Sequence, residues 1–566
     1  MSDAILIFTF SPVQSFITEA RRARDLYVGS RILVCLAKAA GLVMGQRGTL
    51  IYPAALSDDV PNKLVARVAW EEAEAIAQEA KNALLSEWRW IADTAQNNLP
   101  NKEPSPDDRW RDVWTRQVAH LWELYWAAAS LENRSYKEAY DEASRTLDAA
   151  KRTRMFDASE EQGLKDTLSG CREALHTTTL NAKEYWAAVG KQATAAKLQL
   201  NGRERLDAIG ATKRFSKIAD ESRFPSTSTV ASRPFLNRVR QHKELADYRQ
   251  TVEELLNGYL YKPNHDDPDW PYDGDLLFVE TLTPQRLDSS YGLAVPDPGW
   301  LQMARDTLHE VYQRVELRPS PYYAIIVLDG DNMGKRVSEC TTETEHTELS
   351  RKLAEFAEQV RSIVEQQHHG NLIYNGGDDV LAMAPVATAF PLARTLADKF
   401  SEITNGTASA GIAVAHHLFP LGAVLEAARQ AERQAKQAGR DAVCVRTLKR
   451  SGETLEMRSP WKAIGDTFTE MTKLFQGDAD GEPLSSKFAY DVLQTAYALP
   501  EADEKSQAEL RRLLKRHRNP KHPQAPDPDK WAERLHTWAT QLPEQSPEEL
   551  GRWLVFARFV AQGGRE

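Results

Sequence analysis

The stretch Ile325-Ile326-Val327-Leu328-Asp329-Gly330-Asp331, together with Tyr374-Asn375-Gly376-Gly377-Asp378-Asp379 further along the chain, decides the fold. The first run predicts a buried strand that ends in an aspartate. The second predicts a hairpin, because Asn-Gly is frequent in tight turns with positive φ at both central residues. The two strand ends would bring three carboxylates together, which is costly unless divalent cations lie between the oxygens. The sequence therefore predicts a paired-metal site of the kind that serves nucleotidyl transfer.

Hydrophobic periodicity around these stretches predicts a complete α/β domain. We expect strands at 323–328, 371–374, 380–384, 407–415 and 442–448, and helices at 343–367, 392–403 and 421–437. The order βαββαβ is that of a ferredoxin-like palm, here with one further helix and strand appended.

The 566-residue chain is too long for one hydrophobic core. Its predicted fold class is α+β multidomain, with two ferredoxin-like palm domains and two mainly helical domains. The expected limits are 1–95 for a first palm, 96–245 for a helical domain, 319–455 for the second palm and 456–566 for a C-terminal helical domain. Residues 246–318 are expected to form a connecting segment, with a return to the first palm as one option.

An internal similarity supports the first palm. Residues 48–54 (Gly-Thr-Leu-Ile-Tyr-Pro-Ala) parallel residues 370–376 (Gly-Asn-Leu-Ile-Tyr-Asn-Gly), and each run follows a predicted strand and a long helix. The interpretation is two related palms, one of which has lost its acidic hairpin, although two short apolar strands can also match by chance. Ser11-Pro12 is expected to cap and open the first helix, because a hydroxyl residue followed by proline is typical of helix starts.

Composition places the chain among globular proteins, with 42% hydrophobic and 27% charged residues. The formal net charge of -10 means that the surface as a whole does not attract nucleic acid, so RNA contact requires a local patch or partner subunits. The four cysteines are scattered without CxxC spacing and predict neither a zinc site nor a disulfide framework. The N-terminus lacks a secretory signal and the apolar run 32–44 is too short to span a bilayer, so we expect a cytoplasmic protein.

Asp329, Asp378 and Asp379 are the candidate catalytic residues and metal ligands, and Gly330 would let its backbone carbonyl approach a metal closely. The alternative is an acidic, solvated turn, the usual fate of Asp-Gly-rich loops. The flanking strands argue against this alternative, because their composition predicts burial on both faces. Lys436, in the last turn of a predicted helix, either complements the helix dipole or directs a point charge at a triphosphate.

Three motifs in this order resemble the GGDEF/class III nucleotide cyclase superfamily: Leu328-Asp329-Gly330-Asp331-Asn332-Met333-Gly334, Asn375-Gly376-Gly377-Asp378-Asp379 and Ala435-Lys436-Gln437-Ala438-Gly439-Arg440. Three further runs narrow the resemblance: Phe10-Ser11-Pro12-Val13-Gln14-Ser15-Phe16-Ile17, Arg24-Asp25-Leu26-Tyr27-Val28-Gly29-Ser30 and Arg223-Phe224-Pro225-Ser226-Thr227-Ser228. Together they resemble the large polymerase/cyclase subunit of type III CRISPR effector complexes, in the III-B branch, over residues 6–440.

The resemblance implies an enzyme that makes cyclic oligoadenylates from ATP when its complex has bound target RNA complementary to its guide. It implies Mg²⁺ (or Mn²⁺) on Asp329, Gly330, Asp378 and Asp379. The first palm would supply part of the nucleotide pocket but no metal ligands, since Thr9-Phe10-Ser11 and Pro53-Ala54 stand where acids would be needed. The implied partners are other subunits of the complex, guide CRISPR RNA and target RNA, with no membrane. The implied nucleotide-binding residues are Gly330, Asn332, Asn375, Gly376, Gly377, Lys436, Ser11, Gln14 and Ser30.

The sequence departs from the family's pattern in two respects. Many relatives begin with an HD nuclease domain, whereas this sequence starts at the first palm strand and its one His-Asp pair, His265-Asp266, lies in a Pro-Asp-rich stretch. We therefore expect no HD nuclease. The family often carries a zinc site where Asp166, Ser169 and Asp207 stand in place of cysteines. Too few thiolates remain, so we expect no structural zinc and a helical domain held by packing alone.

A basic run near the C-terminus is either a solvated helix face or, in an RNA-guided complex, a contact surface for the guide or target backbone. Its candidate residues are Arg511, Arg512, Lys515, Arg516 and Arg518. Two other functions stay open. A stand-alone diguanylate-type cyclase would pair two chains, whereas one chain here supplies both palms. A non-catalytic, ATP-binding scaffold subunit is disfavoured by the complete acidic triad.

Overall fold

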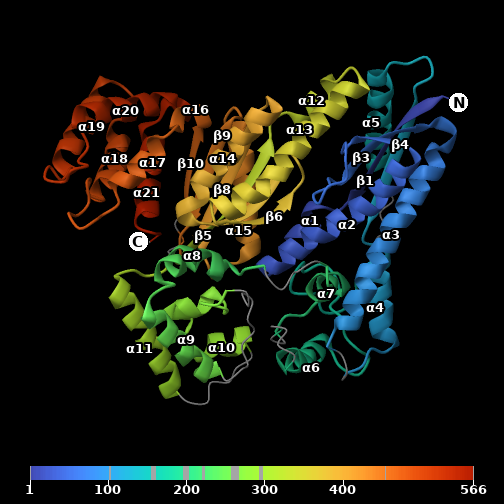
Figure 1. The fold of residues 1–566 in the computed structure, drawn as a ribbon, viewed down its shortest axis with the longest axis horizontal. Helices are drawn as coiled ribbons and strands as arrows, with labels where there is room; N and C mark the ends of the chain where they lie inside the picture. The colour runs from blue at the N-terminus through green and yellow to red at the C-terminus, as the bar shows by residue number, and fades with distance from the viewer. Residues whose placement is uncertain are drawn as a thin grey trace.

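The computed structural model describes residues 2–100, 104–153, 161–195, 200, 203–218, 224–256, 267–291, 298–450, 452 and 454–564. Two β-sheets form its centre, one with the strand order β2-β3-β1-β4 and one with the order β10-β9-β8-β5-β7-β6. Helices cover and connect the two sheets (Figure 1). The predicted α+β multidomain class with two palms is therefore confirmed.

The first palm contains the shorter sheet. Its elements are β1 (Asp3–Ser11), α1 (Gln14–Thr18), α2 (Ala23–Arg47), β2 (Thr49–Tyr52), β3 (Lys63–Ala69), α3 (Ala73–Asn98), β4 (Glu123–Ser130) and α5 (Tyr136–Arg152). All pairings in the sheet are antiparallel, which gives the ferredoxin-like order. β4 lies beyond the predicted limit at residue 95, in a region predicted to be helical, so both expectations are wrong. Its alanine-rich run favours a helix locally, and pairing with β1 makes it a strand.

The start of α1 also differs from the prediction. Its N-cap is Val13, no side chain caps the helix, and Ser11 is the last residue of β1. Ser11 pairs with Glu123 of β4, so the sheet extends through the residue that was expected to cap the helix. Long-range strand pairing therefore overrides the local helix-start signal.

The second palm contains the longer sheet. Its elements are β5 (Tyr322–Gly330), α12 (Met333–Glu339), α13 (Glu343–Arg361), β6 (Asn371–Asn375), β7 (Asp379–Pro385), α14 (Val386–Thr404), β8 (Ala408–His416), α15 (Leu421–Gln437), β9 (Ala442–Leu448) and β10 (Thr454–Pro460). A π-helical turn continues α13. The predicted elements agree with these bounds to within two residues, except that α14 starts six residues earlier than expected. β10 was not predicted, and it moves the end of this palm from residue 455 to Pro460.

Equivalent edge strands relate the two palms. β2 pairs with β3 and β6 pairs with β7, and both pairings shift register at the same point. The shift falls between Leu50 and Tyr52 in the first palm and between Leu372 and Tyr374 in the second. A bulge at the same place in both similar runs favours a shared architecture over a chance match.

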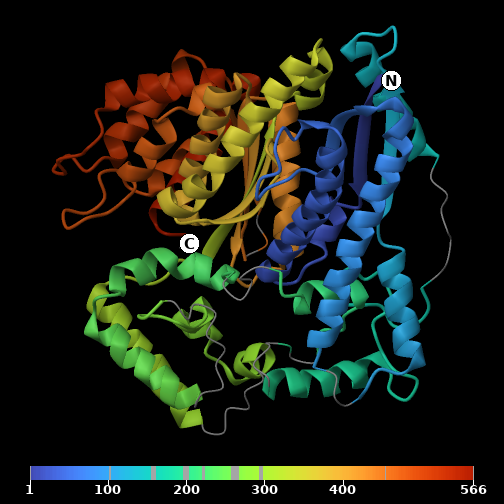
Figure 2. The ribbon, with the colours of Figure 1, turned by 45° about the vertical axis from the view of Figure 1, so that its right-hand side comes forward.

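Two helical modules accompany the palms: segments before β4 and after α5 form the first, and the second follows it in sequence before β5 (Figure 2). The first joins the end of α3 to α4 (Asp108–Ala119), α6 (Ala182–Ala195) and α7 (Ala208–Phe215), around buried Trp110 and Trp186. The second contains α8 (Thr227–Val239), α9 (Lys243–Leu256), α10 (Pro284–Tyr291) and α11 (Pro298–Val315). It has its own core, which includes Tyr248, Trp270 and Tyr312. The described residues of 246–318 (246–256, 267–291 and 298–318) thus contribute to a separate module and add no strand to the first palm.

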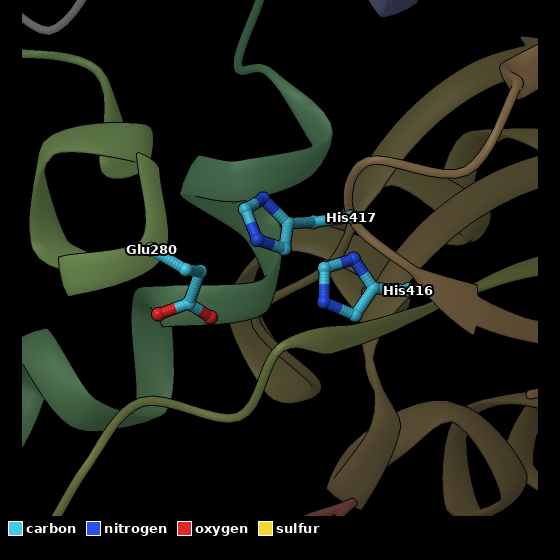
Figure 3. A group of neighbouring side chains, drawn as sticks. All are labelled: Glu280, His416 and His417. Carbon is cyan, nitrogen blue, oxygen red and sulfur yellow. The ribbon is translucent and has the colours of Figure 1, made fainter. Parts of the chain in front are cut away.

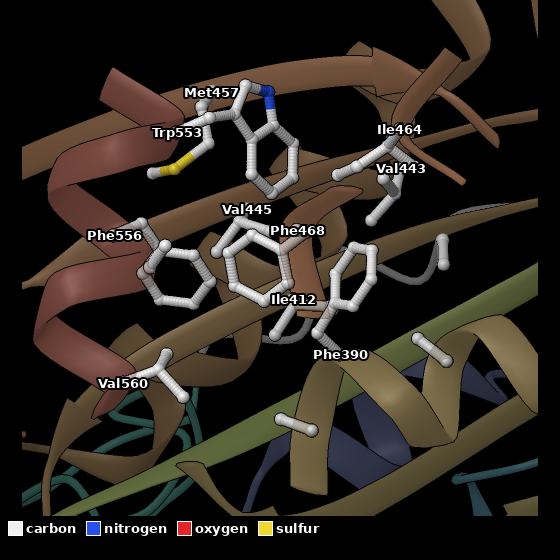
Figure 4. Packing of buried hydrophobic residues seen from close by; sticks show 14 of the residues in the cluster. Phe390, Ile412, Val443, Val445, Met457, Ile464, Phe468, Trp553, Phe556 and Val560 are labelled. Atoms are coloured by element: carbon white, nitrogen blue, oxygen red, sulfur yellow. The ribbon is translucent and has the colours of Figure 1, made fainter. Parts of the chain in front are cut away.

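The C-terminal helices pack on the second palm. They are α16 (Trp461–Ile464), α17 (Thr467–Leu474), α18 (Lys487–Ala498), α19 (Glu504–His517), α20 (Pro528–Gln541) and α21 (Pro547–Ala561). Figure 4 shows Phe468 of α17 between Phe390 of α14 and Phe556 of α21, with ring centroids 4.4 and 5.4 Å apart. This domain and one face of the second sheet therefore share a single hydrophobic core.

α2 is long and apolar enough to cross a membrane, by length and composition alone. Within the protein, 61% of its apolar window is buried. Residues such as Leu26, Ile32 and Leu36 belong to the core of the first palm. The helix therefore serves as a core helix of that palm.

Candidate active site at the strand ends of the second palm

Three carboxylates meet at one end of β5 and β7. The two strands pair antiparallel, with Asp329 opposite Asp379. The Gly330 N–H donates to the Asp378 carbonyl over 2.8 Å, and the Gly376 N–H closes the hairpin onto the Asp379 carbonyl, also over 2.8 Å. The structure thus brings together the three aspartates that the sequence singled out, because β5 and β7 are neighbours in the sheet.

The carboxylates concentrate negative charge in a poorly solvated site. Burial, and then repulsion from Asp329, raise the pKa of Asp378 to about 6. Burial, followed by repulsion from Asp329 and Asp378, raises the pKa of Asp379 to about 8. Without a cation, Asp379 would therefore hold a proton at neutral pH. Three closely placed carboxylates form a donor set that fits hard divalent cations such as Mg²⁺ or Mn²⁺.

Lys436 lies beside this acidic site, in the last turn of α15. Its Nζ is 2.5 Å from Asp329 Oδ1 and 2.8 Å from Glu432 Oε1. Burial opposes the charge on Lys436, but the hydrogen bonds to these two acids outweigh burial and raise its pKa. The ammonium thus balances part of the negative charge. A triphosphate contact, which stays a prediction, requires Lys436 to exchange these partners for phosphate oxygens.

Two further charged residues, which were not predicted from the sequence, lie at this site. Arg429 and Glu432 precede Lys436 on α15 by seven and four residues, which places all three on one face of the helix. Burial lowers the pKa of Arg429, and attraction to Asp379 and Glu426 offsets only part of this shift. The helical spacing from Lys436 is the sequence signal that identifies both residues.

The hairpin turn differs from the predicted one. Gly377 has a φ of 98° and is the one residue of 375–379 with a positive φ, so Asn375-Gly376 is not the central pair of a primed turn. The buried Asn375 Nδ2 donates to the Ala357 carbonyl over 2.9 Å and to Asp59 Oδ2 over 3.2 Å. Asn375 was predicted to bind the nucleotide. In the structure its side chain instead joins the hairpin to α13 and to the first palm.

Two glycines let the backbone pass close behind the acids. A Cβ on Gly330 would lie 2.6 Å from Phe400 Cζ and 3.3 Å from Asp378 Cβ. A Cβ on Gly376 would lie 2.5 Å from Tyr374 Oη. Asn332, the N-cap of α12, is exposed and has a φ of 56°. Nucleotide contacts of Gly330, Asn332, Gly376 and Gly377 stay predictions.

Asp331, two residues after Asp329, has a structural role. Its carboxylate accepts hydrogen bonds from Thr407 Oγ1 and Ser409 Oγ, each over 2.8 Å, and from the Asp441 N–H over 2.9 Å. Asp331 is 3% exposed. It therefore anchors the loop after β5 to the starts of β8 and β9.

The three first-palm residues predicted to bind the nucleotide, Ser11, Gln14 and Ser30, lie in different surroundings. Ser30 is 2% exposed within α2, and a nucleotide contact of its hydroxyl stays a prediction. Ser11 Oγ donates to Glu123 Oε2 over 3.1 Å. Gln14 is exposed and stays a prediction.

The palms contact each other beside the hairpin. The Ala54 N–H donates to Ser350 Oγ over 2.7 Å. Tyr136 Oη lies 2.7 Å from His346 Nδ1. Together with the Asn375–Asp59 contact, these bonds hold the first palm against α13 and the catalytic hairpin.

The positions of the predicted lost zinc site form a polar cluster around a guanidinium. Arg172 pairs with Asp207 and with Glu19 of the first palm. Asp166 accepts hydrogen bonds from the Leu168 and Ser169 N–H groups over 2.7 and 2.6 Å. The expectation that packing alone holds this module is therefore wrong, because Arg172 joins its buried acid to the first palm. His265-Asp266 and Arg223 lie outside the described residues.

The C-terminal basic run lies on and just after α19. Arg511 pairs with Asp529 over 2.6 Å, and Arg512 pairs with Glu509 over 2.7 Å. Lys515 and Arg516 are exposed, and Arg518 is the C-cap residue of α19. Two of these five residues are thus engaged in local ion pairs, and RNA contact stays a prediction.

A second group of potential metal ligands lies near the start of α15. Possible ligand atoms of Glu280, His416 and His417 lie within 4.8 Å of one another (Figure 3). Burial, followed by repulsion from Arg450, lowers the pKa of His416 to about 4, so its ring is neutral at pH 7. The Leu418 N–H donates to His416 Nδ1 over 3.2 Å, which leaves the proton of the neutral ring on Nε2. His416 therefore has no free nitrogen lone pair for a metal.

Two family models match this chain. The model described as Cas10/Cmr2, second palm domain, matches residues 322–444. The model described as CRISPR-associated protein Cmr2, N-terminal, matches residues 5–93. The CRISPR system Cmr subunit Cmr2 of Pyrococcus furiosus is 32% identical over 231 residues, which cover 34% of this chain and 26% of the relative. The aligned part thus spans about a quarter of that relative.

Solved structures of the type III-B Cmr-beta complex contain chains of similar fold. The match in the apo state has a TM-score of 0.63 and 14% identity, covering 93% of this chain and 78% of the other. The match in the state bound to cognate target RNA has a TM-score of 0.64 and 13% identity, covering 93% and 80%. At this identity the likeness shows the fold. The predicted resemblance is confirmed for the two domains that the family models match.

Proposed function

We propose that this Cas10/Cmr2-type chain is the large subunit of a type III-B CRISPR effector complex, and that its second palm makes cyclic oligoadenylates from ATP when target RNA is bound. The two family matches support the subunit assignment. The convergence of Asp329, Asp378 and Asp379 at paired strand ends carries the chemical part of the proposal. The proposed partners are the other subunits, guide CRISPR RNA and target RNA, in the cytoplasm.

In the proposed reaction, a ribose hydroxyl of one ATP attacks the α-phosphorus of another, a phosphodiester bond forms and pyrophosphate leaves. Bound divalent cations would activate the hydroxyl and neutralise the leaving group. Asp329, Asp378 and Asp379 would hold these cations, with the Gly330 carbonyl as a further oxygen ligand. Bound cations would neutralise part of the negative charge on Asp329 and so weaken its attraction for the Lys436 ammonium. The ammonium is then available to a triphosphate, and Arg429 adds a second positive charge on the same helix face.

The test is mass spectrometry of the products that the reconstituted complex forms from ATP and Mg²⁺, with and without cognate RNA. We expect oligoadenylate only with target RNA, and none from the Asp378→Ala/Asp379→Ala variant. Asp108→Ala, at a fully exposed carboxylate on α4, is the control and should leave product formation unchanged. Product from the double variant would refute the assignment of these acids.

The two alternatives predict different outcomes when the same complex is given ATP or, in a parallel reaction, GTP. A scaffold subunit would bind ATP in the assembled complex without releasing pyrophosphate. A diguanylate-type cyclase would form a cyclic dinucleotide from GTP without any RNA. The contacts between the two palms of one chain disfavour the second alternative, because the surface beside the hairpin is already covered.

A further inference from the structure

A large cavity lies at the opposite end of the second palm from the acids. Its volume is about 800 Å³, and the α1–α2 turn, the first helical module, the start of α8 and the β8–α15 connection line it. At this end Tyr322 of β5 pairs with His416, a neighbour of the lining residue His417. Asp329 is seven residues further along β5, which separates the two sites by about 23 Å. The cavity is therefore distinct from the candidate active site.

The described lining of this cavity carries more positive than negative charge. Six arginines line it, together with three carboxylates: Arg21, Arg22, Arg24, Arg203, Arg214 and Arg286, and Glu204, Asp273 and Asp275. Two acids outside the lining also pair with these arginines, Asp25 with Arg214 over 2.6 Å and Asp288 with Arg203 over 3.4 Å. Three arginines share Glu204: Arg21 at 3.9 Å, Arg22 at 3.4 Å and Arg214 at 2.8 Å. Burial lowers the pKa of Arg22, and repulsion from Arg214 and Arg21 acts in the same direction, against the attraction of Glu204. The lining thus has a small local excess of positive charge, in contrast to the net charge of -10 of the whole chain.

Three helices begin at the cavity wall. The lining includes the first residues of α2, α8 and α15, and each of these helices has at least thirteen residues. Ser226 caps α8, whereas no side chain caps α2 or α15. Free N–H groups at helix starts carry partial positive charge and bind anions. The helix starts thus add to the charge of the arginines.

One wall of the cavity is apolar. Phe224 lines it and stacks on Tyr27, with ring centroids 4.7 Å apart and an interplanar angle of 14°. Leu418, which is 39% exposed, and Phe419 also line it. A flat, uncharged group can therefore rest on this wall while an attached anion faces the arginines.

We propose that this cavity binds a ligand that carries phosphate groups and a nucleobase. The phosphate oxygens would accept hydrogen bonds from the arginines and from the N–H groups at the start of α15, and the base would pack on the Phe224 wall. Two sources share this chemistry: a free nucleotide and the backbone of single-stranded RNA. Binding rests on fixed positive charge, so it requires no divalent cation, in contrast to binding at the aspartates.

Gly422, in the first turn of α15, offers a matched pair of variants. It lines the cavity, a Cβ there has open space around it, and its φ is not in the positive region. Gly422→Asp adds a negative charge where an anion would bind, yet it favours the helix because acids stabilise helix starts. Gly422→Asn has nearly the same shape without the charge.

The experiment measures binding to the full-length chain in chelator-containing buffer, by calorimetry with ATP and by fluorescence anisotropy with a short unstructured RNA. We expect at least one of the two to bind, about tenfold or more weaker binding in Gly422→Asp, and a change within about twofold in Gly422→Asn. ATP binding identifies a nucleotide site and RNA binding a strand site, and either supports the proposal.

Three outcomes would overturn it. One is that neither ligand binds the wild-type chain. Another is that Gly422→Asp and Gly422→Asn bind equally well. The third is that Lys515→Ala/Arg516→Ala abolishes binding while Gly422→Asp retains it, which would locate the site on α19. Unchanged thermal unfolding of Gly422→Asp excludes a folding defect. The result is independent of oligoadenylate synthesis, which is measured with Mg²⁺ at the aspartates.

Discussion

Replacement of Asp379 by asparagine should stabilise the cation-free protein although it removes a candidate catalytic group. The pKa of Asp379 rises from 3.8 to about 8, first because of burial and then because of repulsion from Asp329 and Asp378. A carboxyl with a raised folded-state pKa lowers the stability of the folded state at every pH above its unfolded value. The effect disappears below about pH 3.8, because both states then bind the proton.

The magnitude follows from the same shift. In the unfolded state Asp379 loses its proton near pH 3.8, whereas in the folded state it still holds the proton at pH 7. Over the roughly 3 pH units between these two values, each unit destabilises the folded state by about 1.4 kcal/mol. The destabilisation is thus about 4 kcal/mol, and Asp379→Asn should recover much of it. For a domain of 150–250 residues this raises Tm by on the order of 10 °C.

The assay is differential scanning calorimetry of the wild type and Asp379→Asn, in chelator and in Mg²⁺, from pH 7 down to pH 4. We expect the variant to unfold at higher temperature in chelator at pH 7, with the difference shrinking toward pH 4. Mg²⁺ should raise the Tm of the wild type alone. Asp331→Asn is the control, and it should destabilise the protein because Asp331 accepts three hydrogen bonds. A variant that unfolds at or below the wild-type temperature in chelator at pH 7 would refute this reasoning.

Three further predictions concern packing, ion pairing and pH. Gly330→Ala should lose activity and about 1–3 kcal/mol of stability, because its Cβ would lie 2.6 Å from Phe400 Cζ; Gly334→Ala, with open space around its Cβ, should do neither. Arg172→Ala should lower stability by about 3–5 kcal/mol in chemical denaturation, because buried Asp207 loses its cation; a loss below about 1 kcal/mol would contradict this. Burial, and then repulsion from Lys63, lower the pKa of His346 to about 4. Because the folded state keeps His346 neutral, the folded protein loses about 2 kcal/mol of stability between pH 6.5 and pH 5, as the unfolded state takes up a proton. His346→Gln should flatten that part of the stability–pH profile.

Local pattern predicted the second palm well. The alternation and burial of β5, β7 and β8, together with the apolar stripe of α15, are properties of short segments, so their limits could be read from the sequence. Asp329 meets Asp378 and Asp379 because β5 and β7 are neighbours in the sheet. A hairpin that pairs with β5 brings its turn to the end of β5, where Asp329 lies. The first palm was predicted less completely, since alanine-rich β4 becomes a strand only through pairing with β1.

The sequence by itself determined the fold class, the palm order and the aspartates that meet at its edge, because these depend on periodicities of a few residues. Tertiary structure decided which polar side chains are buried or already hydrogen-bonded to other parts of the protein. Asn375 contacts the first palm, Ser30 is buried in α2, and Arg172 pairs across two domains. It also decided that the starts of α2, α8 and α15 surround one cavity. Contacts between residues hundreds of positions apart depend on how whole domains pack, and no local pattern in the chain encodes them.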